Sequence, residues 1–95
     1  MRHAAKVDSN HSAVVQALRA VGAQVQSLAM VGAGCPDLLV LYRGTLVLME
    51  VKDGSLPPSH RRLTPLEAQF FTQWSDGPVY LVESVDDALM AIEAI

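Results

Sequence analysis

Three charged side chains stand at the ends of two apolar segments. Asp37 opens the segment 37–42 (DLLVLY), and Glu50 and Lys52 close the segment 45–52 (TLVLMEVK). Carboxylates bind hard divalent cations such as Mg²⁺, which lower the pKa of a bound water and polarise phosphorus–oxygen bonds. A lysine beside such an ion can position that water and stabilise charge on a phosphate under attack. These residue types together predict phosphodiester hydrolysis.

A hairpin would bring the three side chains together. If residues 43–44 (Arg-Gly) form a two-residue loop, the two apolar segments pair as antiparallel strands. Side chains alternate between the faces of a strand, so Asp37, Glu50 and Lys52 would point from the same face. The expected cross-strand pairs are Tyr42–Thr45, Leu41–Leu46, Leu39–Leu48 and Asp37–Glu50.

Opposed carboxylates on a sheet repel each other, and burial adds a desolvation cost. A divalent cation between Asp37 and Glu50 would remove that conflict, with the main-chain carbonyl of Val51 as a further ligand. Alternatively, Lys52 forms an ordinary ion pair with Glu50 or Asp53 and Asp37 simply begins a strand. Short carboxylate-x-Lys strings are common, so the spacing of all three residues carries the argument.

The remaining elements follow from periodicity and boundary residues. We expect a helix over 9–21, capped by Asp8 or Ser9 and ended at Gly22. A short strand over 23–29 and a glycine-rich loop over 32–36 precede the hairpin, and a loop over 53–63 follows it. A second helix would start at a capping box of Thr64 and Glu67 and run to 76–77, before a strand over 79–82 and a last helix after Ser84.

The order αβββαβα predicts an α/β fold in which helices flank a mixed central sheet. The hairpin strands are nearly continuous apolar runs, which is typical of strands covered on both faces. The 95 residues are too few for two cores, so residues 1–95 should form a single domain.

Composition narrows the class of protein. The chain is 51% hydrophobic with one cysteine, Cys35, which excludes an internal disulfide and favours a reducing, cytoplasmic environment. No segment approaches the length of an apolar membrane span, and residues 1–6 do not resemble a signal peptide.

Charge is distributed unevenly along the chain. Residues 1–62 carry all seven Lys and Arg with four acids, whereas residues 63–95 carry six acids and no Lys or Arg. The acidic third would face away from a polyanion. The candidate phosphate contacts are His60, Arg61, Arg62, Arg19, Lys6 and Arg2; an ordinary solvated loop explains residues 60–62 equally well.

The chain resembles the PD-(D/E)xK nuclease superfamily and, more narrowly, the stand-alone VRR-NUC domains of phages and bacteria, which are similar to Holliday-junction resolvases. The matching segments are 34–40 (GCPDLLV), 48–54 (LMEVKDG), 63–65 (LTP), 8–11 (DSNH) and 18–22 (LRAVG). Together they span most of the chain.

The resemblance implies a restriction-endonuclease-like domain that cuts branched or structured DNA, such as Holliday junctions or flaps, as a homodimer. It implies that Asp37 and Glu50 bind Mg²⁺ or Mn²⁺ and that Lys52 is the catalytic lysine, with no small-molecule cofactor and no membrane partner. The expected setting is the cytoplasm of a bacterial or phage-infected cell.

Two positions depart from the family pattern. Relatives usually carry glutamine where this chain has Glu67. Glu67 could still reach the site and is a further accessory candidate, although its capping box explains it without catalysis. Many relatives place an acid or amide of the first helix near the metal, and Asp8, Asn10 and His11 are the accessory candidates here, each with a competing role as a cap or solvated residue.

Two other function classes compete with the nuclease. A catalytically silent DNA-binding module with the same fold would bind DNA in a salt-sensitive way without cutting it. A structural or interaction domain would have no affinity for metal. The complete set of Asp37, Glu50 and Lys52 favours the nuclease over both.

Overall fold

A computed structural model describes residues 10–95 of the chain. Its elements are α1 (His11–Ala20), β1 (Gln24–Ser27), β2 (Leu38–Tyr42), β3 (Thr45–Val51), η1 (Pro58–His60), α2 (Pro65–Gln73), β4 (Val79–Val82) and α3 (Val85–Ala91). The predicted order αβββαβα is therefore confirmed, with one short 3₁₀ helix, η1, added between β3 and α2. Among these residues, no helix has both the length and the apolar character required to cross a bilayer.

The four strands form one mixed sheet in the order β1-β2-β3-β4. The neighbours β1–β2 and β2–β3 are antiparallel, and β4 joins β3 in parallel. The β2–β3 register pairs Leu39 with Leu48 and Tyr42 with Thr45, as predicted. Arg43 and Gly44 have φ values of 49° and 81°, the positive values that a tight two-residue hairpin turn requires.

The prediction for α1 is confirmed at the end of the helix and wrong at its start. At its end, Gly22 (φ 96°) donates to the Arg19 carbonyl at 3.0 Å and Ala23 donates to the Leu18 carbonyl at 3.1 Å, a Schellman motif with the glycine where it was predicted. At its start, the residue in the capping position is Asn10, and its side chain does not cap the helix. The cap predicted at Asp8 or Ser9 is wrong, because the helix begins later than expected.

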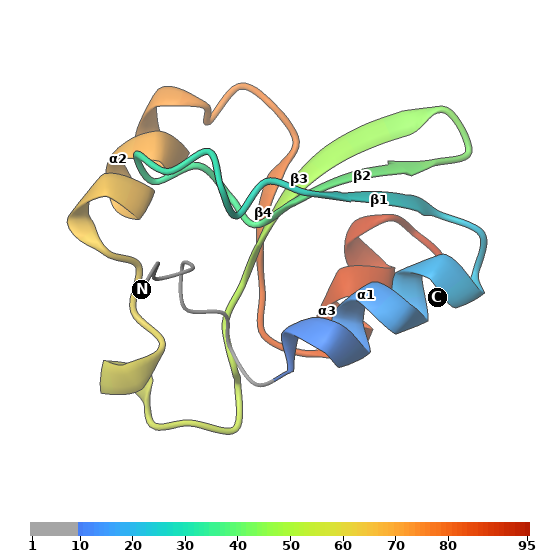
Figure 1. The fold of residues 1–95 in the computed structure, drawn as a ribbon, viewed down its shortest axis with the longest axis horizontal. Coiled ribbons are helices and arrows are strands. Elements are labelled where there is room, and N and C mark those ends of the chain that lie inside the picture. The colour runs from blue at the N-terminus through green and yellow to red at the C-terminus, as the bar shows by residue number, and fades with distance from the viewer. Residues whose placement is uncertain (1–9) are drawn as a thin grey trace.

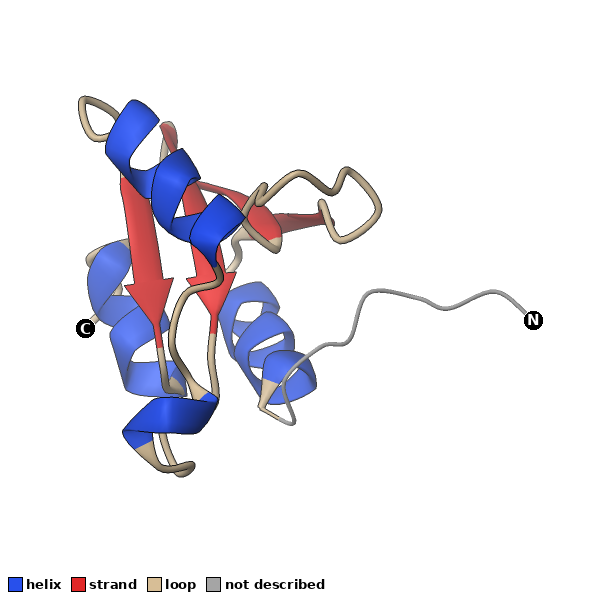
Figure 2. Ribbon diagram, turned by 90° about the vertical axis from the view of Figure 1, so that its left-hand side faces the viewer, coloured by secondary structure: helices blue, strands red, loops and turns tan. Residues whose placement is uncertain are grey.

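The helices α1 and α3 lie on one face of the sheet, here called the inner face, and α2 lies on the other, the outer face (Figures 1 and 2). The inner face carries the core, in which alternate strand residues meet the apolar stripes of the two helices. Its buried hydrophobic residues are Val14, Leu18, Ala23, Leu38, Val40, Val47, Met49, Val51, Val82, Ala88 and Ile92.

The outer face is covered only in part, so the prediction that the hairpin strands are covered on both faces is wrong for this face. Leu41 and Leu46 are 42% and 53% exposed, and α2 contributes no buried residue. An apolar cavity of about 620 Å³ lies between α2 and the outer face, lined by residues that include Leu39, Leu48 and Trp74. The ring of Trp74 stacks on that of Phe70 with centroids 4.9 Å apart.

Candidate active site

Asp37, Glu50 and Lys52 line one small cavity on the outer face, at the carboxyl-terminal end of β3. Its volume is about 180 Å³. The other lining residues come from the loop before β2 and from the start of α2: Ala29, Gly32, Gly34, Cys35, Thr64, Leu66 and Glu67. The structure thus brings together the three residues that the sequence selected for chemistry.

Asp37 lies one residue before β2, and both its main-chain carbonyl and its side chain accept hydrogen bonds. Its carbonyl accepts from Leu28 N–H at 2.7 Å, and its Oδ2 accepts from Val51 N–H at 2.8 Å. The carboxylate therefore continues the β2–β3 ladder beyond the last paired residues. The N–H and C=O of one strand residue point to the same side, so the Val51 carbonyl lies on the Asp37 side of β3.

Glu50 is an acid buried in this cavity. It is 3% exposed, and its Oε1 is buried without a hydrogen-bond partner. Its Oε2 lies 3.6 Å from Lys52 Nζ. The pKa of Glu50 is raised from 4.5 to about 9, first by burial and then by the nearby Asp37 and Glu67 carboxylates, against the opposing effect of Lys52. The conflict between opposed carboxylates that the sequence predicted is thus present.

Glu67 connects the start of α2 to the lysine. Its Oε1 accepts from Lys52 Nζ at 2.9 Å and from Thr64 N–H at 2.8 Å. The predicted capping box is confirmed, since Thr64 Oγ1 also accepts from Glu67 N–H at 3.2 Å. Burial acts to raise the pKa of Glu67, yet the Thr64 and Lys52 hydrogen bonds outweigh it and lower that pKa. Glu67 therefore caps α2 and also lines the cavity beside Lys52, and its accessory role in the site stays a prediction.

Gly34 lets the loop and α2 meet. It has φ 81°, and a Cβ at this position would overlap the Leu66 carbonyl and approach Glu67 N to 2.9 Å. Only glycine permits both this backbone conformation and this approach. The loop that presents Asp37 is therefore packed directly on the helix turn that presents Glu67.

The cavity suits a divalent cation through two of its carboxylates. Across residues 10–95, no three His, Cys, Asp or Glu side chains form a complete metal-binding group, and Glu67 is already engaged by Lys52 and Thr64. Mg²⁺ commonly takes only one or two protein carboxylates and fills its shell with water and phosphate oxygens. The unpartnered Oε1 of Glu50 beside Asp37 provides such a donor set.

Asn10 and His11, the two first-helix candidates among the described residues, do not line this cavity. Asn10 Nδ2 donates to the Lys52 carbonyl at 3.0 Å and to the Glu83 carbonyl at 3.2 Å. His11 lines a separate hollow between α1 and the sheet, and its Nε2 is buried without a partner. Asp8 lies outside the described residues.

Within residues 10–95, the predicted phosphate contacts come from separate elements, the α1 helix and the loop after β3. Arg61 donates from Nη1 to Glu83 Oε2 at 2.7 Å and from Nε to the Leu56 carbonyl at 2.8 Å, so its role in this structure is to hold the loop. His60 and Arg62 are exposed. Arg19 Nη2 donates to the Val25 carbonyl at 3.3 Å. Lys6 and Arg2 lie outside the described residues.

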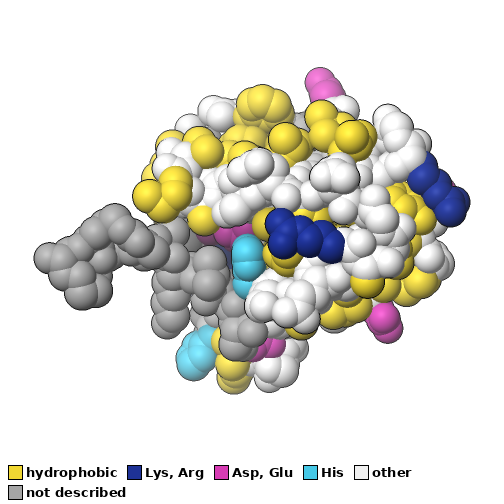
Figure 3. All heavy atoms as spheres, turned by 45° about the vertical axis from the view of Figure 1, so that its right-hand side comes forward, with side chains coloured by type: hydrophobic (Ala, Val, Ile, Leu, Met, Phe, Trp, Pro, Cys, Tyr) yellow, Lys and Arg dark blue, Asp and Glu magenta, His cyan; other side chains and the backbone are white. Residues whose placement is uncertain are grey.

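Cationic side chains do not gather on the face that Figure 3 presents. Apart from the grey atoms, Lys and Arg (dark blue) lie there at two separate places, one of them beside His (cyan) and Asp or Glu (magenta) side chains. Phosphate contacts from such a surface would be individual ones, without a broad basic patch.

Asp53 is a buried acid whose role the sequence reasoning missed. It is 8% exposed, and its Oδ1 accepts from Ser55 N–H at 2.9 Å and from Ser55 Oγ at 2.6 Å. This is the local turn that an Asp-Gly-Ser string favours, so the signal was available in residues 53–55. It shapes the chain immediately after Lys52.

Searches with protein-family models, curated proteins and solved structures found no match to this chain.

Proposed function

We propose that this protein is a metal-dependent endonuclease that hydrolyses DNA phosphodiester bonds. The observation that carries the proposal is the convergence of Asp37, Glu50 and Lys52 in one cavity, with a buried and unpartnered oxygen on Glu50. A buried carboxylate with a strongly raised pKa beside a second carboxylate is costly for stability, and such arrangements concentrate at functional sites.

Each residue has a definite role in this proposal. Asp37, Glu50 and the Val51 carbonyl hold Mg²⁺ or Mn²⁺, which when bound supplies a water of lowered pKa and a counter-charge for the phosphate. Lys52 places its ammonium beside that phosphate and stabilises the charge that develops on it. Glu67 keeps Lys52 Nζ near Glu50 through the 2.9 Å contact.

The position of the site supports an approach of DNA from the α2 side. The acids of the last helix, Asp86 and Asp87, lie on α3, across the sheet from the cavity. A polyanion that meets the outer face therefore does not meet them. This side also carries Lys52 and the start of α2 with Glu67, so only part of the acidic stretch 63–95 lies away from it.

The proposal includes the VRR-NUC assignment and a restriction-endonuclease-like fold, and with them branched DNA such as Holliday junctions or flaps as substrate. It also includes a homodimer in the cytoplasm of a bacterial or phage-infected cell. The uncharged cavity under α2, with Trp74 and Leu46 about half exposed, supports association with a second copy, because burying such a surface requires no charge to be desolvated.

The test is cleavage of labelled four-way junction, flap and linear duplex with Mg²⁺ or Mn²⁺, with chelator as the metal-free arm. Lys52→Ala should lower the cleavage rate by roughly 10²–10⁴-fold. Arg43→Ala is the matched control, since it removes one positive charge from the exposed hairpin turn far from the cavity and should leave the rate unchanged.

Each outcome discriminates among the function classes. Metal-dependent cutting that Lys52→Ala removes and Arg43→Ala retains supports the nuclease. Salt-sensitive DNA binding without cutting of any substrate would replace it with the catalytically silent binding module.

A further inference from the structure

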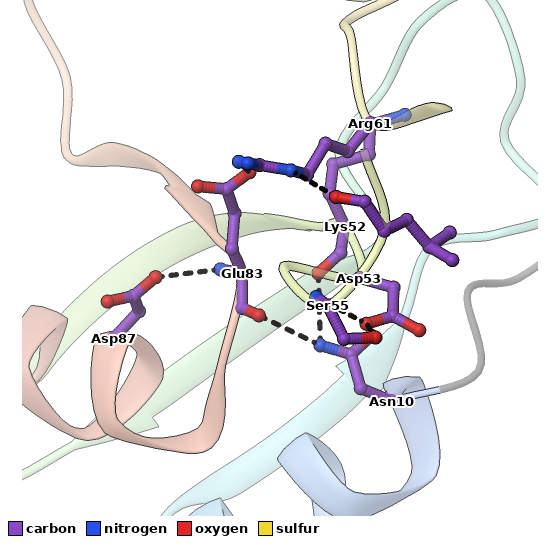
Figure 4. A network of polar contacts seen from close by, with 8 residues as sticks. Asn10, Lys52, Asp53, Ser55, Arg61, Glu83 and Asp87 are labelled. Atoms are coloured by element: carbon purple, nitrogen blue, oxygen red, sulfur yellow. Dashed lines mark hydrogen bonds and ion pairs between the residues drawn. The ribbon is translucent and has the colours of Figure 1, made fainter. Parts of the chain in front are cut away.

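A polar network joins the start of α1, the chain after β3 and the turn between β4 and α3 (Figure 4). Asn10 lies at its centre and bridges two main-chain carbonyls, with Nδ2 donating to Lys52 O at 3.0 Å and to Glu83 O at 3.2 Å. The three residues are far apart in the sequence. The bridge therefore depends on the tertiary fold.

Asn10 occupies the capping position of α1, but its side chain forms this bridge and does not cap the helix. Asparagine in the capping position of a helix normally accepts from a main-chain N–H of the first turn. The Asn10 side chain makes no such bond, and its Oδ1 is buried without a partner. The amide is thus oriented by its two donor contacts to Lys52 and Glu83.

The Lys52 main chain lies just beyond the end of regular pairing. The last β3–β4 pair is Val51 with Val82, after which Lys52 N–H donates to the Val82 carbonyl at 2.9 Å. The Asn10 amide then satisfies the Lys52 carbonyl. In a continuing parallel ladder, the next main-chain N–H of β4 would donate to this carbonyl. Because β3 and β4 diverge here, the Asn10 side chain supplies the donor instead.

The other half of the bridge is itself firmly placed. Glu83 O also accepts from Gly54 N–H at 3.0 Å, and a Cβ on Gly54 would lie 2.7 Å from that oxygen. The Lys52 carbonyl is therefore tied through Asn10 to a carbonyl anchored in the β4–α3 turn.

We propose that Asn10 is a positioning residue that fixes the main chain of Lys52. A lysine side chain has many rotamers, so the location of its ammonium relative to Glu50 and Glu67 depends on a fixed backbone origin. The bridge provides that origin from α1. The importance of the Asn10 bridge for catalysis rests on the nuclease function proposed above. The restraint that the bridge places on the Lys52 main chain does not depend on that function.

The test compares Asn10→Ser with Asp87→Ala. Serine is a preferred capping residue, so Asn10→Ser protects the start of α1 while removing the amide bridge. Asp87→Ala removes the bond from Glu83 N–H to Asp87 Oδ2 at 2.9 Å and leaves in place both contacts of the Glu83 carbonyl, to Asn10 and to Gly54. The measurement is amide hydrogen exchange in the metal-free full chain, taken as the ratio of the Lys52 exchange rate to the rates of the Val47 and Met49 amides. This ratio should rise about tenfold in Asn10→Ser. It should keep its wild-type value in Asp87→Ala.

Cleavage kinetics give the second readout. Asn10→Ser should lower kcat about tenfold with KM for DNA unchanged, and Asp87→Ala should leave both unchanged. Equal acceleration of all core amides would overturn the proposal, because Asn10 would then support only global stability. A wild-type kcat with wild-type Lys52 exchange would overturn it as well.

The two proposals can fail separately. If the wild-type protein cuts no DNA, the nuclease function is rejected, and the exchange of the Lys52 amide alone decides whether Asn10 restrains this main chain.

Discussion

The two faces of the sheet are built from the same strands but serve different ends. On the inner face, α1 and α3 close over alternate residues such as Val40 and Met49, which are completely buried. On the outer face, α2 stands over an apolar cavity, Leu46 is half exposed and Glu50 is buried as an acid. The inner face stabilises the fold, whereas the outer face carries the candidate site at a cost in stability.

The difference shows how a small domain separates stability from chemistry. Alternation along β3 places Met49 and Val51 in the core and Glu50 in the cavity. A rigid core on one side can therefore hold an energetically unfavourable carboxylate pair on the other. Three perturbations test this division, in order of decreasing effect for each substitution or each pH unit.

The largest expected effect comes from truncating the inner face. Leu18→Ala should lower the free energy of unfolding by about 3–4 kcal/mol, because Leu18 is fully buried and its loss leaves a cavity. Leu46→Ala should cost less than about 1 kcal/mol, since Leu46 is 53% exposed. Urea denaturation of both variants measures the contrast. If the two variants lose equal free energy of unfolding, and the loss in Leu46→Ala grows with protein concentration, a second copy of the chain covers the outer face.

The next effect is a pH dependence that arises from Glu50. Its pKa is raised from 4.5 to about 9, so between these values the folded state binds a proton that the unfolded state has lost. Stability therefore falls as pH rises through this window, by up to about 1.4 kcal/mol per pH unit. Glu50→Gln should remove this slope.

The measurement is urea unfolding of wild type and Glu50→Gln with chelator present, across the same pH range. The difference between the two proteins isolates Glu50 from other titrating groups. Added Mg²⁺ should flatten the wild-type slope, because metal binding favours the ionised carboxylate. A constant difference between the proteins would mean that Glu50 is ionised throughout and that the outer face carries no such cost.

The smallest effect concerns the second glutamate of the cavity. Glu67→Ala should cost about 1 kcal/mol through loss of the capping box and lower the cleavage rate about tenfold, because Lys52 Nζ loses its 2.9 Å partner. Glu67→Gln keeps an oxygen that can accept from both Thr64 and Lys52 and should retain most of both properties. Thermal unfolding and single-turnover cleavage measure the pair. An unimpaired rate in Glu67→Ala would restrict Glu67 to capping.

The local elements could be predicted because their signals are short-range. Residues 43–44 determine the hairpin turn and hence the register that brings Asp37 toward Glu50, and Thr64 with Glu67 determines the start of α2. Alternation then places Glu50 and Lys52 on one face without knowledge of the remaining chain. The residues of the candidate site were found in this way.

Contacts between distant segments could not be predicted in the same way. Apolar runs in β2 and β3 indicate strands that can be buried on both faces, but only the tertiary structure decides that α2 leaves Leu41 and Leu46 partly exposed. Likewise, Asn10 looks like a helix cap until β3 and the β4–α3 turn bring the Lys52 and Glu83 carbonyls to its amide.

By itself, the sequence determined the strand register, the capping box and the choice of Asp37, Glu50 and Lys52, because turns, caps and alternation depend on neighbouring residues. The tertiary structure decided which buried polar groups lack a hydrogen-bond partner, such as Glu50 Oε1, and which are hydrogen-bonded, such as Lys52 Nζ. Burial, hydrogen-bond partners and the raised pKa of Glu50 arise only when segments distant in the chain meet.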